Sequence, residues 1–123
     1  VMGVAHFAGL GYRKGVGSTV TQGTNRATGV TINAMCGTIT THNASLAAES
    51  SAVFTVTNSF VEIGDVVLIS QRSGKVALNT QVEVTAVANG SFDITVINNN
   101  VAAGTAETGA IVLNFAVIKA VTA

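Results

Sequence analysis

The chain has 123 residues, the length of one domain, and 48% of them are hydrophobic while only 10% are charged. Soluble domains ordinarily carry about 25% charged residues, and the formal net charge here is zero. This balance lacks the basic excess of a nucleic-acid-binding protein, so we expect no nucleic-acid partner. Few charges and no net charge favour association. We therefore expect partner subunits to cover much of the apolar surface.

No apolar run reaches the roughly 18 residues that a membrane span requires, and the chain does not start with the charged and then apolar pattern of a signal peptide. We therefore expect no membrane partner. The first residue is Val1, which indicates a chain that was processed, trimmed or cut from something longer. Because Cys36 is the single cysteine, we expect neither an intrachain disulfide nor a cysteine pair for a metal.

Residues 1–17 form a Gly-rich lead-in that mixes apolar and flexible residues without a clear period. We interpret this lead-in as an extended N-terminal arm, and residues 18–123 as a single β-sandwich domain. An apolar arm without a core of its own is expected to dock on a neighbour. The arm residues that we predict to contact a partner protein are Phe7, Leu10, Tyr12 and Arg13.

Eight short runs rich in Val, Ile, Thr and Phe follow the arm, separated by turn residues at intervals of about 8–12 residues. They cover residues 18–22, 28–33, 37–41, 52–57, 65–70, 80–87, 91–98 and 110–119. This pattern predicts an all-β fold, an antiparallel β-sandwich, and the count of eight fits a jelly-roll-like arrangement. The one helix candidate, residues 43–49, is short enough that we favour a loop with one helical turn.

The dipeptide Asn89-Gly90 predicts a hairpin between two of these runs. A two-residue loop would place the apolar residues of the two strands on opposite faces of the sheet. A three-residue loop over residues 88–90 instead makes one face apolar, because register follows the hydrophobic pattern. We therefore predict the longer loop, with a left-handed Gly90 in a bulge. Its expected pairs are Val82 with Val96, Val84 with Ile94, and Ala86 with Phe92.

The last run has two apolar faces. Its odd-numbered residues, from Ile111 to Val117, point one way, and three even-numbered apolar residues point the other way. One face can join the core, whereas the other requires a loop, the arm or another subunit to cover it. The same argument applies to residues 66–69. The strand residues that we predict to contact a partner protein are Val112, Ala116 and Ile118.

Groups that could support catalysis are few, because the chain holds only six acidic residues and two histidines. We find no zinc-protease, nucleophile-elbow or phosphate-loop motif. Glycines 9, 11 and 15 resemble a dinucleotide loop only loosely, with the wrong spacing. A glycan hydrolase would need paired carboxylates in a cleft, and the acids lie mostly next to strands and turns. We therefore expect no enzyme activity, no catalytic residue, no cofactor and no metal site.

Three polar features have two interpretations each. His42 follows a strand and suits a metal ligand or a pH-sensitive contact or, as we favour, a loop histidine with local or intersubunit hydrogen bonds. Cys36 suits a small buried hydrophobic residue better than a nucleophile, because the sequence places no base nearby. The asparagine run at residues 98–100 suits a sugar-binding loop or, more simply, a polar turn.

Six short segments of the sequence, taken together, resemble segments of a known protein family. They are TVTQ at 19–22, ATGVTIN at 27–33, GTITT at 37–41, FTVTNS at 54–59, GSFDITV at 90–96 and VLNFAVIKA at 112–120. Together they resemble a widespread family of small bacteriophage virion proteins, with similar modules at the ends of tail-fibre-like proteins. The resemblance covers residues 17–120 and implies a β-sandwich that works as a homo-oligomer, with a trimer as the expected order.

Two functions follow from this resemblance. The first is a capsid decoration, or cement, protein that binds the major capsid protein and stabilises the shell. The second is a tail-fibre or receptor-binding tip module that contacts the host through polar loops at residues 70–75 and 98–100. The small size, the two-faced strands and the arm favour the capsid surface of the virion over the tail.

Overall fold

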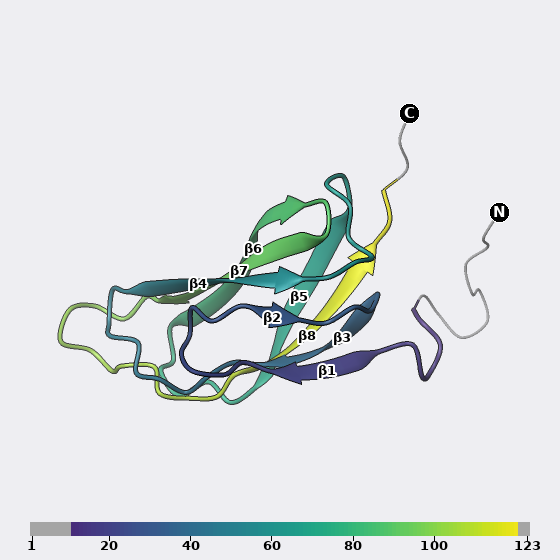
Figure 1. Ribbon diagram of the computed structural model, residues 1–123. Helices are drawn as coiled ribbons and strands as arrows, with labels where there is room; N and C mark the ends of the chain where they lie inside the picture. Colours follow the sequence, from purple (N-terminus) through teal and green to yellow (C-terminus); the bar gives the residue numbers. More distant parts are fainter. Residues whose placement is uncertain (1–10, 121–123) are drawn as a thin grey trace.

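The computed structural model describes residues 11–120, and their chain forms eight β-strands without a helix (Figure 1). Each of the eight predicted runs overlaps one strand, so the prediction of an all-β chain is confirmed. The strands are β1 (Ser18–Thr21), β2 (Val30–Thr31), β3 (Cys36–Thr40), β4 (Ser51–Thr57), β5 (Val66–Ser73), β6 (Thr80–Ala88), β7 (Ser91–Asn98) and β8 (Val112–Ile118).

The strands form two four-stranded sheets that pack as a sandwich (Figure 1). Sheet A has the strand order β1-β3-β8-β5, and sheet B has the order β2-β4-β7-β6. No helical turn forms at residues 43–49, where the chain is a loop tied to the last long loop by a bridge between Leu46 and Glu107.

The prediction of purely antiparallel sheets is wrong at one edge of each sheet. Strand β1 pairs with β3 in parallel, and β2 pairs with β4 in parallel. The reason is that β1, β2, β3 and β4 alternate both in direction and in sheet. Strands two apart in the sequence therefore become neighbours that point the same way. Since jelly rolls are built from antiparallel strands, these mixed sheets depart from that arrangement.

The core lies between the two sheets and is made by alternate residues of each strand. Sheet B contributes Phe54, Phe92 and Ile94, each at most 1% exposed. Sheet A contributes the predicted inward face of β8, from Ile111 to Val117, whose four inward residues are all buried. The rings of Phe92 and Phe115 meet across the sandwich with centroids 5.6 Å apart. Each such side chain contributes about 1.5–3 kcal/mol by leaving water.

The β6–β7 hairpin confirms part of the predicted register and corrects the turn. Val82 pairs with Val96 and Val84 pairs with Ile94, as expected. However, Ala88 pairs with Ser91, so the loop has two residues, and Phe92 pairs with Val87 instead of Ala86. A bulge between Val84 and Ala86 restores one apolar face. Gly90 has the expected positive φ of 84°.

One end of the sandwich is held by a buried carboxylate. Glu107 is 0% exposed and accepts hydrogen bonds from the Val76 amide at 2.9 Å, the Ala77 amide at 3.0 Å and the Thr80 hydroxyl at 2.7 Å. The Gly109 amide donates a fourth bond at 2.8 Å. These bonds join the β5–β6 connection to the loop before β8. A side chain at Gly109 would collide with the backbone of Gly74, so this approach requires glycine.

The guanidinium of Arg26 completes this end and is only 4% exposed. It donates to the carbonyl oxygens of Ala44, Glu107 and Gly109 and to the Thr41 hydroxyl. Its hydrogen bonds therefore go to the backbone of Glu107 and not to the carboxylate. Since these loops hold no free buried side-chain polar atom, the cluster satisfies the requirement that buried polar groups be hydrogen-bonded.

The substitution Glu107→Gln should lower the free energy of unfolding by about 3 kcal/mol or more, because the new amide group would face the donors that the carboxylate now accepts. Urea unfolding followed by circular dichroism measures the change. The matched control is Glu83→Gln on the exposed side of β6, which should shift stability by no more than about 0.5 kcal/mol. Equal effects of the two substitutions would contradict the structural role of Glu107.

Candidate functional site: the outer face of sheet A

An apolar strip lies on the outer face of sheet A. The register places Val66 beside Ile118 and Leu68 beside Ala116, and we call these four residues the apolar strip. Val66 is 50% exposed, Leu68 52% and Ile118 43%. No charged side chain lies among them, since their neighbours on the same face are Cys36, Thr38, Ser70 and Asn114. The two-faced strands of the sequence thus place apolar side chains toward solvent.

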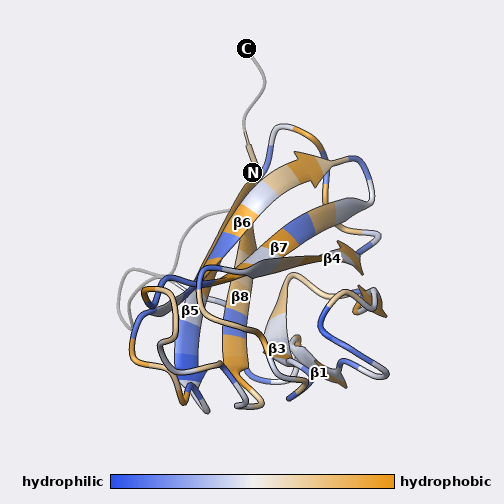
Figure 2. Ribbon diagram, turned by 90° about the vertical axis from the view of Figure 1, so that its left-hand side faces the viewer, coloured by the Kyte–Doolittle hydropathy of each residue, from blue (hydrophilic) through white to orange (hydrophobic). Residues whose placement is uncertain are grey.

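The outer face of sheet B has a different character. Its side chains pair through polar contacts, with Thr55 donating to Asp93 at 2.7 Å and the hydroxyls of Thr85 and Thr95 2.8 Å apart. Coloured by hydropathy, β8 of sheet A is largely orange with a hydrophilic band, and β7 of sheet B alternates between orange and hydrophilic bands (Figure 2). Of the two outer faces, only that of sheet A carries a group of adjacent, exposed apolar side chains. Contact of such a group with water is unfavourable.

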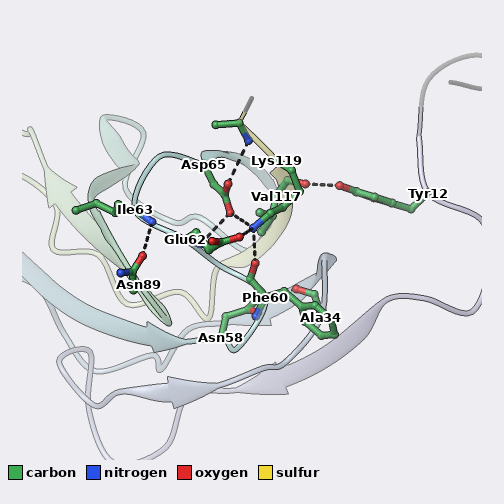
Figure 3. Close-up of polar contacts among 11 residues, drawn as sticks. Tyr12, Ala34, Asn58, Phe60, Glu62, Ile63, Asp65, Asn89, Val117 and Lys119 are labelled. Atoms are coloured by element: carbon green, nitrogen blue, oxygen red, sulfur yellow. Dashed lines mark hydrogen bonds and ion pairs between the residues drawn. The ribbon is translucent and has the colours of Figure 1, made fainter. Parts of the chain in front are cut away.

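Tyr12 lies at the end of this face. Its hydroxyl donates to the carbonyl oxygen of Val117, the residue before Ile118, and the residue is 44% exposed (Figure 3). The contact brings the segment that precedes β1 to the end of β8, although 105 residues separate the two in sequence. Part of the predicted arm, residues 11–17, therefore lies close to the apolar strip.

A polar clamp positions the end of β8 next to the β4–β5 loop (Figure 3). The carboxylate of Asp65 accepts bonds from the Lys119 ammonium at 2.6 Å, the Glu62 amide at 2.9 Å and the Ala120 amide at 3.2 Å. Lys119 also donates to the Phe60 carbonyl at 2.9 Å. Burial by itself raises the pKa of Asp65, but the bonds from Lys119, Glu62 and Ala120 outweigh it and hold the pKa below its ordinary value.

Asparagine side chains fix the same loop from the other side (Figure 3). Asn58 is fully buried and donates from its amide to the Ala34 carbonyl at 2.7 Å. The side-chain oxygen of Asn89, in the β6–β7 turn, accepts the Ile63 amide at 2.9 Å. The loop so held exposes two large apolar residues, Phe60 at 48% and Ile63 at 68%. These two residues are separate from the strip, because the exposed ion pair of Lys119 and Glu62, 2.9 Å apart, also lies at this end.

The structure brings together some of the predicted contact residues. Ala116 and Ile118 lie in the apolar strip, and Tyr12 lies at its end. Val112 is at the opposite end of β8, beside Thr40 and Ser73, so it is separate from the strip. Arg13 is exposed and its carbonyl accepts the Val16 amide. Phe7 and Leu10 lie outside the described residues.

Phe60 and Ile63 are not among the predicted contact residues, and Val66 and Leu68 are predicted only to belong to a run with two apolar faces. The pairing of Leu68 with Ala116 was not predictable from the run itself, because it depends on how β5 and β8 align. Phe60 and Ile63 had a weak signal, namely large apolar residues between a turn asparagine and Gly64. Such isolated residues are common on protein surfaces and identify no site alone.

The remaining polar features serve the fold. His42 accepts the Ala44 amide at 2.9 Å through Nδ1, which confirms the local hydrogen-bonding interpretation. Asn98 is buried and donates to the carbonyls of Leu46 and Thr105, while Cys36 is half-buried on the outer face. A shallow hollow lies beside the asparagine run, lined by residues 49–51 and 97–101.

Within residues 11–120, no three His, Cys, Asp or Glu side chains gather closely enough to hold a metal ion. The same part of the chain contains no helix long and apolar enough to cross a membrane. Comparisons of the chain with protein-family models, curated proteins and solved structures found no match. The chemical feature that distinguishes the described surface is the exposed apolar strip.

The two buried carboxylates should make the fold sensitive to acid. Burial raises the pKa of Glu107, but bonds from Thr80 and three backbone amides outweigh it, so its pKa, like that of Asp65, is lowered by folding. Stability is then fully present above the unfolded-state values of about 4 and falls as the pH drops toward the folded-state values. Urea midpoints measured between pH 7 and pH 3 should decline below about pH 4.5.

The variant Asp65→Asn removes one of these groups and should show a shallower decline over the same pH range, with lower stability at pH 7. The exposed-site variant Glu83→Gln should follow the unsubstituted chain. A midpoint that stays constant down to pH 3 would show that neither carboxylate is held in its charged form by the fold.

Proposed function

We propose that the chain is a bacteriophage virion structural protein, a capsid decoration protein that binds the major capsid protein and stabilises the shell. The observation that carries this proposal is the apolar strip, an uncharged face with residues about half exposed. A face of this kind is typical of a surface that a protein partner covers. The resemblance of the sequence to small virion proteins supplies the identity of the particle, and the virion is therefore the proposed location.

The contribution of such a protein to a shell is thermodynamic. Binding to the assembled lattice, and not to free or unfolded capsid subunits, stabilises the assembled state by mass action. The decoration protein must itself be rigid for this effect, because ordering a flexible partner on binding costs free energy. The buried clusters around Glu107 and Asp65 supply that rigidity at the two ends of the sandwich.

The functional unit is proposed to be a homo-oligomer, and the trimer implied by the resemblance stays a prediction. An uncharged, apolar outer face supports association, because burial of apolar surface is the main driving force for stable subunit contacts. The chain is proposed to act without enzyme activity, cofactor or metal. Nucleic acid and membrane are not among its proposed partners, in keeping with its zero net charge.

The alternative function is a tail-fibre or receptor-binding tip module. The observation that favours it is the polar hollow beside Asn99 and Asn100, lined also by Glu49, Ser50 and Ser51. The Asn99 side chain donates to Gln81 at 3.0 Å and the Asn100 side chain donates to the Thr105 carbonyl at 2.9 Å. Such amide-rich loops suit hydrogen bonding to a glycan. They lie at the end of the sandwich opposite to the clamp of Asp65.

The decoration function predicts that particles lacking this chain lose their contents at a lower temperature than complete particles. Adding the purified chain back should restore the higher temperature, measured by dye access to the packaged genome. The variant Ile118→Lys, which places a charge in the apolar strip, should restore it poorly, while Val53→Lys on the outer face of sheet B should restore it fully. Equal heat resistance with and without the chain would contradict the proposal.

A further inference from the structure

Strand β5 has no hydrogen-bonded partner at one edge of sheet A, where β6 of sheet B is its nearest strand. Its hydrogen-bonded neighbour is β8, and no other strand in residues 11–120 pairs with it. The Val117 amide donates to the Met35 carbonyl on the β3 side, so Ala116 and Ile118 face β5. In an antiparallel ladder the paired residues Val66 and Leu68 then bond to β8, and the alternating residues point their backbone groups outward. The outward residues are Val67, Ile69 and Gln71.

The edges formed by β1, β2 and β6 are short or interrupted, whereas this part of β5 is neither. In β6, a bulge between Val84 and Ala86 and the charged Glu83 interrupt the edge. The edge strands β1 and β2 have only four and two residues. In β5 the bulge and Arg72 come only after Gln71. Bulges, charges and shortness are the devices that prevent edge pairing, and residues 66–71 have none of them.

Both faces of β5 are incompletely covered along this stretch. Val66 and Leu68 are about half exposed on the outer face. Val67 and Ile69 point inward and pack against the core, yet they too remain partly exposed at the edge. A strand added at this edge would therefore bury apolar surface on both faces and satisfy the outward amides and carbonyls.

We propose that two copies of the chain pair through β5, antiparallel about a two-fold axis at Leu68, so that their A sheets become one continuous sheet. In this register Val67 of each copy opposes Ile69 of the other, and their outward groups form the hydrogen bonds. The two Leu68 side chains meet on the outer face. A second copy fits because residues 66–71 carry no charge: two identical edges bring no like-charge repulsion to the axis.

This inference rests on the proposed homo-oligomer and specifies its contact. A two-fold pair is isologous, since the same edge serves both copies. It is compatible with a trimer only where two trimers join. The expected particle in solution therefore contains two copies, or six if the trimer also forms. The two-fold pairing also places the apolar strips of the two copies side by side. The pair therefore presents a wider apolar face for the proposed contact with the capsid shell.

Disulfide trapping tests the register. In the full-length chain carrying Cys36→Ser, the substitution Leu68→Cys places two thiols at a non-hydrogen-bonded pair, where Cα atoms lie about 4.5 Å apart and a disulfide is sterically allowed. Mild oxidation should give a covalent two-copy product at micromolar concentration. The matched variant Val53→Cys, exposed on the outer face of sheet B and paired with Thr95 of β7, should stay uncrosslinked. Equal crosslinking of both variants, or no crosslinked product from the Leu68→Cys variant, would overturn the inference.

A charge at the axis gives a second measurement that needs no oxidation. Leu68→Lys should weaken pairing by about tenfold or more, because two ammonium groups would face each other across the axis. Sedimentation equilibrium should then report half the copies found for the unsubstituted chain, while Val53→Lys should leave the mass unchanged. Circular dichroism melting checks that both variants fold. An unchanged mass for the folded Leu68→Lys variant would contradict the pairing.

Other occupants of the edge would give different results. If residues 1–10 of the same chain covered β5, the unsubstituted chain would sediment as a single copy and two Leu68→Cys chains would not link to each other, which overturns the inference. Loss of the two-copy product, with the chain still bound to virions, would refute the pairing and leave the decoration function intact. A clean two-copy product from a chain absent from virions would refute the decoration function alone.

Discussion

The buried carboxylate of Glu107 is the interaction on which one whole end of the sandwich depends. It has no solvent to stabilise its charge, so it requires donors from the surrounding loops, and it receives them from Val76, Ala77, Thr80 and Gly109. Removing such a carboxylate would leave several donors unpaired in the interior. The loops at this end are consequently fixed by side chains and not by extra strands. Asp65 and Asn58 serve the corresponding purpose at the other end.

Rigid ends leave the two outer faces and the sheet edges as the surfaces available for function. The faces differ in chemistry: sheet B presents hydrogen-bonded threonine and aspartate pairs, whereas sheet A presents the apolar strip. A monomer gains nothing from the exposure of Val66, Leu68 and Ile118, because each costs free energy in water. A subunit of an assembly gains contact energy from the same residues. The asymmetry between the faces supports the proposed structural role.

The strands were predictable from sequence because their signal is local: alternating apolar residues between turns define a strand before its partners are known. The inward face of β8 and most of the β6–β7 register followed from the same alternation. The parallel pairing of β1 with β3 and of β2 with β4 was not predictable from this local signal. It depends on the way that successive strands from β1 to β4 alternate between the two sheets. The burial of Glu107 and Arg26 was also unpredictable. Charged loop residues are usually exposed, and their partners lie up to 83 residues away in sequence.

An exposed apolar strip is expected of a chain that occurs in many copies in a particle. The number of copies per particle therefore tests the proposed function most directly. Quantitative mass spectrometry of purified virions, with the major capsid protein as internal standard, gives the copy number. The decoration function predicts copies comparable in number to the capsid protein, in the hundreds for a shell of ordinary size. Absence of the chain from the virion would contradict the account, and a handful of copies would move it from the shell to the tail.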